Sequence, residues 1–355
     1  MSGWREVLGR RWRQAAHWVI VGAAIGYLAW KVPGFVRDVS QSGRTVGSVR
    51  WDWVLLATVC SLAALVVYGE LHRQLLLVGS ARLRVRTVQG INIVQNAVSS
   101  TIPVVGGAGA LVYAIDQLRR RGVDSALASW SVLVAGLVDT LTLVALGALG
   151  LGFAGRIGVV TAVLITLLVV LVSVGGWALL THPAVLWRGL HGLLTLASRI
   201  PGYCPPCRDA WRRRTEEAAQ RLSTRIALLR PGGPRWLLVI ALAIVSWALD
   251  YLALITTVSA VVSPVPWAVL TVGFLIVQGS IALQIFPGGA GLAETGLLGV
   301  LLAAGVAAAP AAVSVLAYRA ISWLGLSLLG WAVYAVWIHT SPVRLHRHTP
   351  ELSEA

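Results

Sequence analysis

Four ionisable side chains lie within long apolar stretches of the sequence, where charge is rare. Three are acids and one is an arginine: Asp139, Asp250, Glu294 and Arg319. A charge at membrane depth is expensive, so such residues usually mark a substrate or proton path. Three acids cannot all pair with one arginine, so at least one must be neutral or bind a proton or cation. We expect the three acids to be candidates for proton coupling, and a structural ion pair between helices is the alternative.

Two glycine-rich stretches interrupt the apolar sequence in the same manner. One contains Pro103 and Gly106-Gly-Ala-Gly109, and the other contains Pro287 and Gly288-Gly-Ala-Gly291. Proline removes a backbone donor and glycine relaxes the dihedral angles, so each stretch predicts a broken helix. A helix that restarts near the midplane offers free N–H groups and a positive dipole end, which suits a phosphate.

The two breaks belong to a longer internal repeat. Gln95 matches Gln278, and the Gly122-Val123 pair that closes the first unit matches Gly305-Val306. Broken helices at corresponding positions in two halves are the best sequence indication of a transporter's site. The alternative is that glycine-rich helices simply pack closely through small residues, which does not account for the matching proline and glycine positions.

A substrate-binding site follows from these patterns. It combines the prolines and glycines of both breaks with a glutamine from each repeat, for which interhelical hydrogen bonding is an equal alternative. It also includes Glu294 and Arg319, because we expect Arg319 to bind the lipid phosphate and Glu294 to hold the arginine when the site is empty. The predicted residues are Pro103, Gly106, Gly107, Gly109, Gln95, Pro287, Gly288, Gly289, Gly291, Gln278, Glu294 and Arg319.

Composition assigns the chain to the membrane. Its 355 residues are 57% hydrophobic and only 12% charged, with a mean hydropathy of +0.77, whereas about a quarter of the residues of a soluble domain are charged. The formal charge of +15 accompanies no basic stretch interleaved with aromatic residues, so we expect no nucleic-acid partner. Orientation in the membrane and contact with anionic lipid explain that charge better.

The expected fold is an all-α polytopic membrane protein with about six full spans plus two re-entrant hairpins. The spans are expected at about 17–36, 53–79, 124–150, 158–181, 236–262 and 307–338. Glu70, His72 and Arg73 end the second span and are expected to snorkel at the interface.

Arginine distribution predicts the orientation of the two hairpins. Basic residues flank the first hairpin on both sides, whereas the second follows the uncharged Ser263-Pro-Val-Pro266 turn. By the positive-inside rule the first enters from the cytoplasm and the second from outside, so the repeats are inverted.

One membrane domain is expected over residues 17–340, in a bacterial inner membrane. Residues 1–16 form a basic cytoplasmic N-terminus and residues 341–355 a cytoplasmic tail. Repeat one covers about 53–181 and repeat two about 236–340. Between them, the basic amphipathic segment 182–235 is expected to lie on anionic headgroups in the cytoplasm.

Two features carry a resemblance to a known family. They are Phe286-Pro-Gly-Gly-Ala-Gly-Leu-Ala-Glu294 followed by Arg319, and Pro103 to Gly109 followed by Gly122. The chain resembles, from about 17 to 340, the membrane region of the lysylphosphatidylglycerol synthase / multiple-peptide-resistance-factor family. Family synthases add a soluble aminoacyl-transfer domain, for which the short tail leaves no room, so the resemblance implies the flippase-like half. Gly136 departs from the family, which usually has an arginine there.

The leading hypothesis is transport of a phospholipid or lipid-linked anion between leaflets, without enzymatic activity. The alternatives are a membrane transferase acting on a lipid headgroup or polyprenyl phosphate, and a non-transporting envelope scaffold. No catalytic residue, cofactor or metal site is predicted. Cys204 and Cys207 form the single Cys-x-x-Cys, which is best explained as a turn with two free thiols because no second pair accompanies it.

Overall fold

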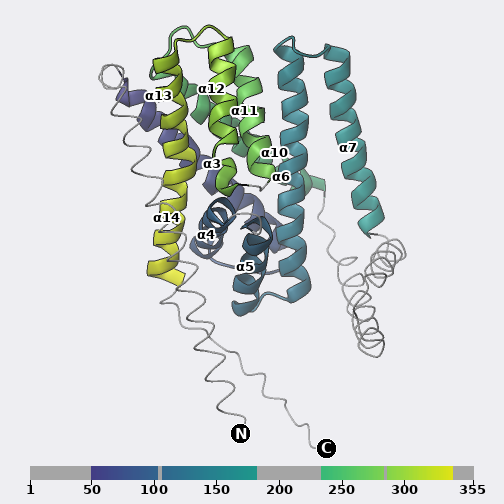
Figure 1. Cartoon of the computed structure of the whole chain (residues 1–355). Helices are drawn as coiled ribbons and strands as arrows, with labels where there is room; N and C mark the ends of the chain where they lie inside the picture. The colour runs from purple at the N-terminus through teal and green to yellow at the C-terminus, as the bar shows by residue number, and fades with distance from the viewer. Residues whose placement is uncertain (1–48, 103–105, 182–232, 284–285, 339–355) are drawn as a thin grey trace, which may run out of the picture. The chain divides into compact units, whose positions relative to one another are not determined.

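A computed structural model of the chain describes residues 49–102, 106–181, 233–283 and 286–338 (Figure 1). The expected first span at 17–36, both termini, Pro103 and nearly all of the basic segment 182–235 lie outside these residues. The described part is helical, as the composition predicts, and it contains no strand.

Four helices among the described residues are long and apolar enough to cross a membrane. They are α3 (Trp51–Val78), α6 (Ser125–Phe153), α10 (Gly233–Ser259) and the composite Ala308–Val336. The composite contains α13 (Ala308–Arg319), a π-helical segment η2 (Ala320–Gly325), α14 (Leu326–Val333) and the start of η3 (Tyr334–Ile338). A further apolar helix, α7 (Val159–Thr181), follows α6. These helices lie where the sequence predicts spans.

Four shorter helices carry the two glycine-rich stretches. They are α4 (Val85–Thr101), α5 (Gly106–Arg120), α11 (Trp267–Ala282) and α12 (Leu292–Ala303). The longest, α4, has 17 residues, which corresponds to about 26 Å at a rise of 1.5 Å per residue. The hydrocarbon core of a bilayer is about 30 Å thick, so each of the four is shorter than that core.

The two helices that follow the breaks end in the same way. At the end of α5, Gly122 has φ 84° and Val123 N donates to Leu118 O; at the end of α12, Gly305 has φ 82° and Val306 N donates to Leu301 O. Each glycine adopts the left-handed conformation that closes a helix in a Schellman-type turn. The sequence repeat is therefore also a repeat of local backbone structure.

The chain divides into two compact units. The described residues of unit 1 fall within 49–66, 89–113 and 248–338, and those of unit 2 within 67–88, 114–181 and 233–247. Unit 1 contains both glycine-rich breaks. The predicted repeat and domain boundaries remain predictions.

Unit 2 buries a histidine that the sequence places at a membrane interface. His72 is only 1% exposed, and its Nε2 lies 3.3 Å from Ser131 Oγ on α6. Snorkelling is therefore wrong for His72, because a hydroxyl from another helix satisfies the ring inside the protein. Glu70 and Arg73, which are partly buried, form an ion pair at 2.6 Å.

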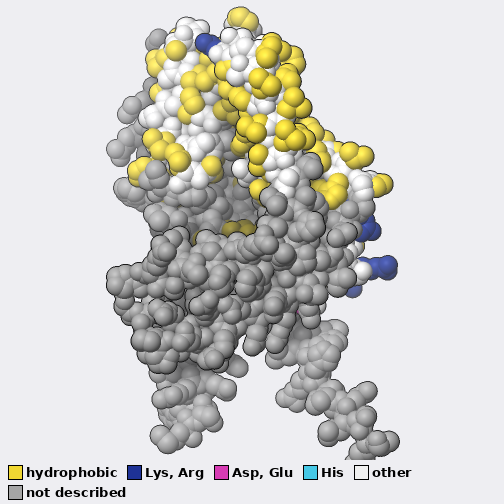
Figure 2. All heavy atoms as spheres, turned by 90° about the vertical axis from the view of Figure 1, so that its right-hand side faces the viewer, with side chains coloured by type: hydrophobic (Ala, Val, Ile, Leu, Met, Phe, Trp, Pro, Cys, Tyr) yellow, Lys and Arg dark blue, Asp and Glu magenta, His cyan; other side chains and the backbone are white. Residues whose placement is uncertain are grey.

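The surface of α7 is apolar, as a lipid-facing helix requires. Figure 2 shows the face that carries α7, where the described side chains are mostly hydrophobic and basic groups lie only at its edges. Val160 is 73% exposed and Leu171 is 68% exposed. In water such a continuous apolar surface would be a binding patch, and in a bilayer it faces hydrocarbon.

Candidate functional site

The second glycine-rich stretch breaks the chain between α11 and α12. The first arm ends at Ala282, a single 3₁₀ turn forms over Pro287–Gly289, and α12 begins at Leu292. Gly288 has φ 55° and Gly291 has φ 89°, in the left-handed region that glycine tolerates. Proline and glycine thus produce the break that the sequence predicts. Figure 1 shows α12 between α11 and α13.

Glu294 lies in the first turn of α12 and uses both carboxylate oxygens. Its Oε2 accepts a hydrogen bond of 2.6 Å from the backbone N–H of Gly291, which begins the helix. Its Oε1 accepts a hydrogen bond of 2.7 Å from Nε of Arg319. The first bond satisfies a free helix N–H, as in a capping box, and the positive end of the helix dipole favours a carboxylate here.

Arg319 comes from α13 and contacts both sides of the break. Besides its bond to Glu294, its Nη2 donates to the carbonyl oxygen of Gly288 at 2.5 Å. Its guanidinium carbon lies 5.0 Å from the centre of the Trp323 ring, within cation–π range. One guanidinium therefore holds the residues before and after the start of α12 together.

The pair is unequally buried. The side chain of Arg319 is 3% exposed, whereas that of Glu294 is 26% exposed. A buried guanidinium without an anion is strongly unfavourable, and removing one partner of such a pair costs about 3–5 kcal/mol. Arg319 therefore requires an anion at all times. The anion that it binds here, the carboxylate of Glu294, is partly exposed at the protein surface.

Glycine in the break is also required for packing. A Cβ atom on Gly288 would overlap Nε1 of Trp323, and one on Gly289 would lie 2.5 Å from Ser280 Oγ. Sequence reasoning assigns these glycines to close approach of a ligand. In this structure the backbone at Gly288 and Gly289 is buried against the chain itself, and Gly291 is the exposed member of the motif.

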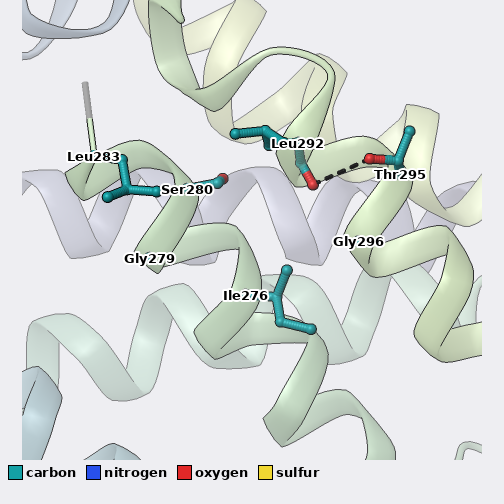
Figure 3. A pocket seen from close by; sticks show the side chains of 7 residues that line it. All are labelled: Ile276, Gly279, Ser280, Leu283, Leu292, Thr295 and Gly296. Carbon is teal, nitrogen blue, oxygen red and sulfur yellow. Dashed lines mark hydrogen bonds between the residues drawn. The ribbon is translucent and has the colours of Figure 1, made fainter. Parts of the chain in front are cut away.

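An open groove runs between the two arms beside the break (Figure 3). Its volume is about 520 Å³, and apolar or small residues form most of its lining: Ile276, Gly279, Ser280, Leu283, Leu292, Thr295 and Gly296. Leu292, Thr295 and Gly296 share a face of α12 that is turned away from Glu294 by helical periodicity. The groove and the ion pair therefore use different faces of the same helix start.

The remaining predicted residues are only partly brought together. In unit 1, Gln278 donates to Asp250 Oδ2 at 2.8 Å, so this glutamine binds an acid of α10. Gln95, on α4, is half-buried and its Oε1 has no hydrogen-bond partner among the described residues. Asp139 lies in unit 2, where its backbone carbonyl accepts a 2.9 Å bond from Trp247 Nε1.

The first break has a different chemistry from the second. The end of α4 carries Ser100 and Thr101, whose hydroxyls donate back to carbonyls of their own helix. Gly106, which starts α5, is buried so tightly that a Cβ atom would lie 2.7 Å from Ser99 O. Gly107 and Gly109 are half-buried in the same first turn.

Sequence reasoning misses one central residue, Trp323. Its Nε1 donates to Ser100 O at 3.0 Å, so it contacts the end of α4 as well as Arg319 and Gly288. The available signal is its spacing four residues after Arg319, which places both on one helical face. Among the described residues, no group of three His, Cys, Asp or Glu side chains could hold a metal ion.

The long apolar helices, with two broken helices packed beside them, define a multi-pass α-helical membrane protein. The chain belongs to the family of the lysylphosphatidylglycerol synthase TM region, whose family model matches residues 15–330. The resemblance seen in the sequence is thereby confirmed over most of the chain. Among curated proteins none matches the chain.

Proposed function

We propose that this protein moves an anionic phospholipid or lipid-linked anion between the leaflets of the cell membrane, without modifying it. The observation that carries the proposal is the contact of buried Arg319 with partly exposed Glu294 at the helix break. Intramembrane charges are retained mainly for function. The family is named after lysylphosphatidylglycerol, a phospholipid whose headgroup contains an anionic phosphate.

The proposed step is an exchange of anions on one guanidinium. Arginine binds carboxylates and phosphates through the same planar set of donors, and charge-assisted bonds of this type are roughly twice as strong as neutral ones. A lipid phosphate arriving from the side of Glu294 replaces its carboxylate on Arg319. The guanidinium is never left unpaired, so the large penalty for a stranded buried charge is avoided at each stage.

The start of α12 supports the same chemistry. Gly291 is exposed, and the helix that follows it directs its dipole toward the break. When Glu294 leaves Arg319, its other oxygen remains on the N–H of Gly291. The carboxylate of Glu294 thus still caps the start of α12 while the phosphate binds Arg319.

The finer parts of the proposal concern orientation and coupling. The repeats are inverted, each broken unit is a re-entrant hairpin, and both termini face the cytoplasm. Asp250, held by Gln278, is the acid best placed in unit 1 to take up a proton during the cycle. The basic segment 182–235 binds anionic headgroups in this scheme.

The decisive experiment uses purified protein in vesicles of phosphatidylethanolamine and phosphatidylglycerol. Fluorescent phosphatidylglycerol is placed in both leaflets, and an impermeant quencher reports how fast the inner pool becomes accessible. The variants are Glu294→Gln with Arg319→Gln, and Arg319→Lys as the charge-preserving control. We expect the double variant to stay folded and lose protein-dependent lipid movement, because it removes both charges without stranding either. The lysine variant retains part of it.

Three results overturn the proposal. Normal lipid movement by the double variant would show that the pair is a structural link between helices. A changed headgroup mass on the probe, seen by mass spectrometry in the wild-type protein alone, would favour the membrane transferase. Absence of movement by the wild-type protein in every lipid tested would favour the scaffold.

A further inference from the structure

The composite helix that contains Arg319 contacts both glycine-rich breaks. Its first part, α13, ends with Arg319 on the second break. Its last part, α14, packs against the end of α4 at the first break, and Figure 1 shows α14 beside α4. Between the two parts lies the π-helical segment Ala320–Gly325.

The contact of α14 with α4 is close and specific. Ser327 Oγ lies 2.9 Å from Ser100 Oγ, and Trp331 Nε1 donates to Thr101 Oγ1 at 3.3 Å. A Cβ atom on Gly330 would overlap the Cβ of Ala97, so the two backbones approach as closely as small residues allow. The last turn of α4 is therefore held by α14.

Trp323 lies in the π-helical segment and joins the two contacts. Its indole N–H donates to the carbonyl oxygen of Ser100 at 3.0 Å, at the end of α4. Its ring lies beneath the guanidinium of Arg319 at 5.0 Å, and its Nε1 borders Gly288. The same side chain thus contacts the first break, the second break and the arginine between them.

The π-helical turn makes this double contact geometrically consistent. A π turn holds one more residue than an α turn, and such turns are frequent at functional sites. If the segment were α-helical, everything beyond it would rotate by about 100°, the angle of one residue in a helix of 3.6 residues per turn. Ser327 and Trp331 could then not face α4 while Arg319 faced Glu294.

We infer that Trp323 is a positioning residue that couples the two helix breaks. It holds the guanidinium of Arg319 in place while the carboxylate of Glu294 is exchanged for a phosphate, and it transmits that exchange to the end of α4. The inference rests on the proposed function, since it assigns the phosphate to Arg319. It adds a second responsive element, the end of α4 at the first break. The state of this element depends on whether Arg319 binds Glu294 or a phosphate.

The test compares Trp323→Phe with Trp247→Phe. Both changes remove an indole N–H that donates to a backbone carbonyl, at 3.0 Å in the first case and 2.9 Å in the second. Trp247 is on α10 and belongs to unit 2, whereas Trp323, Arg319 and both breaks belong to unit 1. It is therefore a matched control for the loss of one partly buried hydrogen bond.

The readout is the reactivity of a cysteine placed at the first break. Ala108 is exposed in the first turn of α5, so Ala108→Cys in a chain with its three native cysteines replaced by alanine reports on that break. Alkylation is measured in nanodiscs of phosphatidylcholine with or without phosphatidylglycerol. We expect phosphatidylglycerol to change the alkylation rate about fivefold, at the lower end of measured couplings between sites. Trp323→Phe abolishes that difference and Trp247→Phe preserves it.

Two outcomes overturn the inference. One is an undiminished phosphatidylglycerol effect in Trp323→Phe, and the other is no effect in the parent protein. The vesicle assay of lipid movement distinguishes failure of this inference from failure of the proposed function. If Trp323→Phe moves lipid like the parent and its alkylation rate still depends on phosphatidylglycerol, only the coupling through Trp323 is disproved. If Arg319→Ala moves phosphatidylglycerol normally, the proposed function is disproved, and the inference that rests on it is disproved as well.

Discussion

The two helix breaks share a sequence motif and differ in the chemistry that holds them. At the second break, an arginine and a glutamate cross-link the chain through Arg319 and Glu294. At the first, neutral groups do so, through the hydroxyls of Ser100 and Thr101 and the indole of Trp323. The Gly-Gly-Ala-Gly motif therefore determines where a helix breaks, and the partner helix determines what the break can bind.

The difference suggests a division of labour within unit 1. A charged break can exchange one anion for another. A break held by neutral hydrogen bonds and close packing can instead change when its neighbour Trp323 moves. We therefore expect substitutions at the charged break to have larger effects than substitutions at the neutral one.

Sidedness gives an all-or-none test of whether the breaks are inverted copies. The turns around Ser263 and Gly305 line one hollow of about 460 Å³, so they share an end of unit 1. Cysteines introduced at these two positions should react with an impermeant reagent only from outside intact cells, and one at Arg120 only from inside. Labelling of Gly305→Cys and Arg120→Cys from the same side would contradict the inversion.

Arg319→Ala should have the largest energetic effect. The substitution strands Glu294, removes the bond to Gly288 and should lower the free energy of unfolding by about 3 kcal/mol. Denaturant titration in mixed micelles measures this change, and the vesicle assay should show no lipid movement. Adding Glu294→Gln should recover most of the stability without transport. Equal stability of the single and double variants would mean that the carboxylate is not stranded.

Glycine-to-alanine changes should have opposite signs at the two breaks. Gly289→Ala forces φ 69° on a residue with a Cβ and brings that atom to 2.5 Å from Ser280 Oγ, so we expect a loss of about 2 kcal/mol. Gly109→Ala lies in a helix with its nearest contact 3.9 Å away, so about 0.5 kcal/mol should be gained. Thermal unfolding of both variants side by side decides this, and destabilisation by Gly109→Ala would mean that the first break is tightly packed at Gly109 as well as at Gly106.

Ser327→Ala should have the smallest effect. It removes the 2.9 Å contact with Ser100, but Ser100 Oγ keeps its 2.7 Å bond to Asn96 O. A single buried hydrogen bond contributes about 1 kcal/mol, and a shift of the unfolding midpoint measures it. A loss as large as that of Arg319→Ala would remove the distinction between a neutral and a charged break.

Much of this molecule is predictable because its signals are local. Proline and left-handed glycine positions determine where a helix stops, so the break at Pro287–Gly291 follows from the sequence. Hydropathy gives the spans for the same reason. The proximity of Glu294 and Arg319 was also expected, because charges in hydrocarbon need partners.

Long-range contacts are what the sequence does not reveal. Trp323 and Ser100 meet across most of the chain, and no period or motif links them. The polar cluster around His72 predicts a position at the membrane interface, while its partner Ser131 comes from another helix. For Gln278 the sequence favours a ligand contact and an interhelical hydrogen bond equally, and its observed partner is Asp250 on α10. In each case the deciding neighbour comes from the packing of a different helix.

The two oxygens of Glu294 have a kinetic consequence. One holds Arg319 and the other holds the N–H of Gly291, so releasing the arginine leaves the start of α12 capped. A rotamer change takes picoseconds to nanoseconds, whereas relaxation of a helix takes about 0.1–1 μs. Because no helical turn has to melt and re-form, side-chain motion alone sets the fastest pace at which the arginine can change partners.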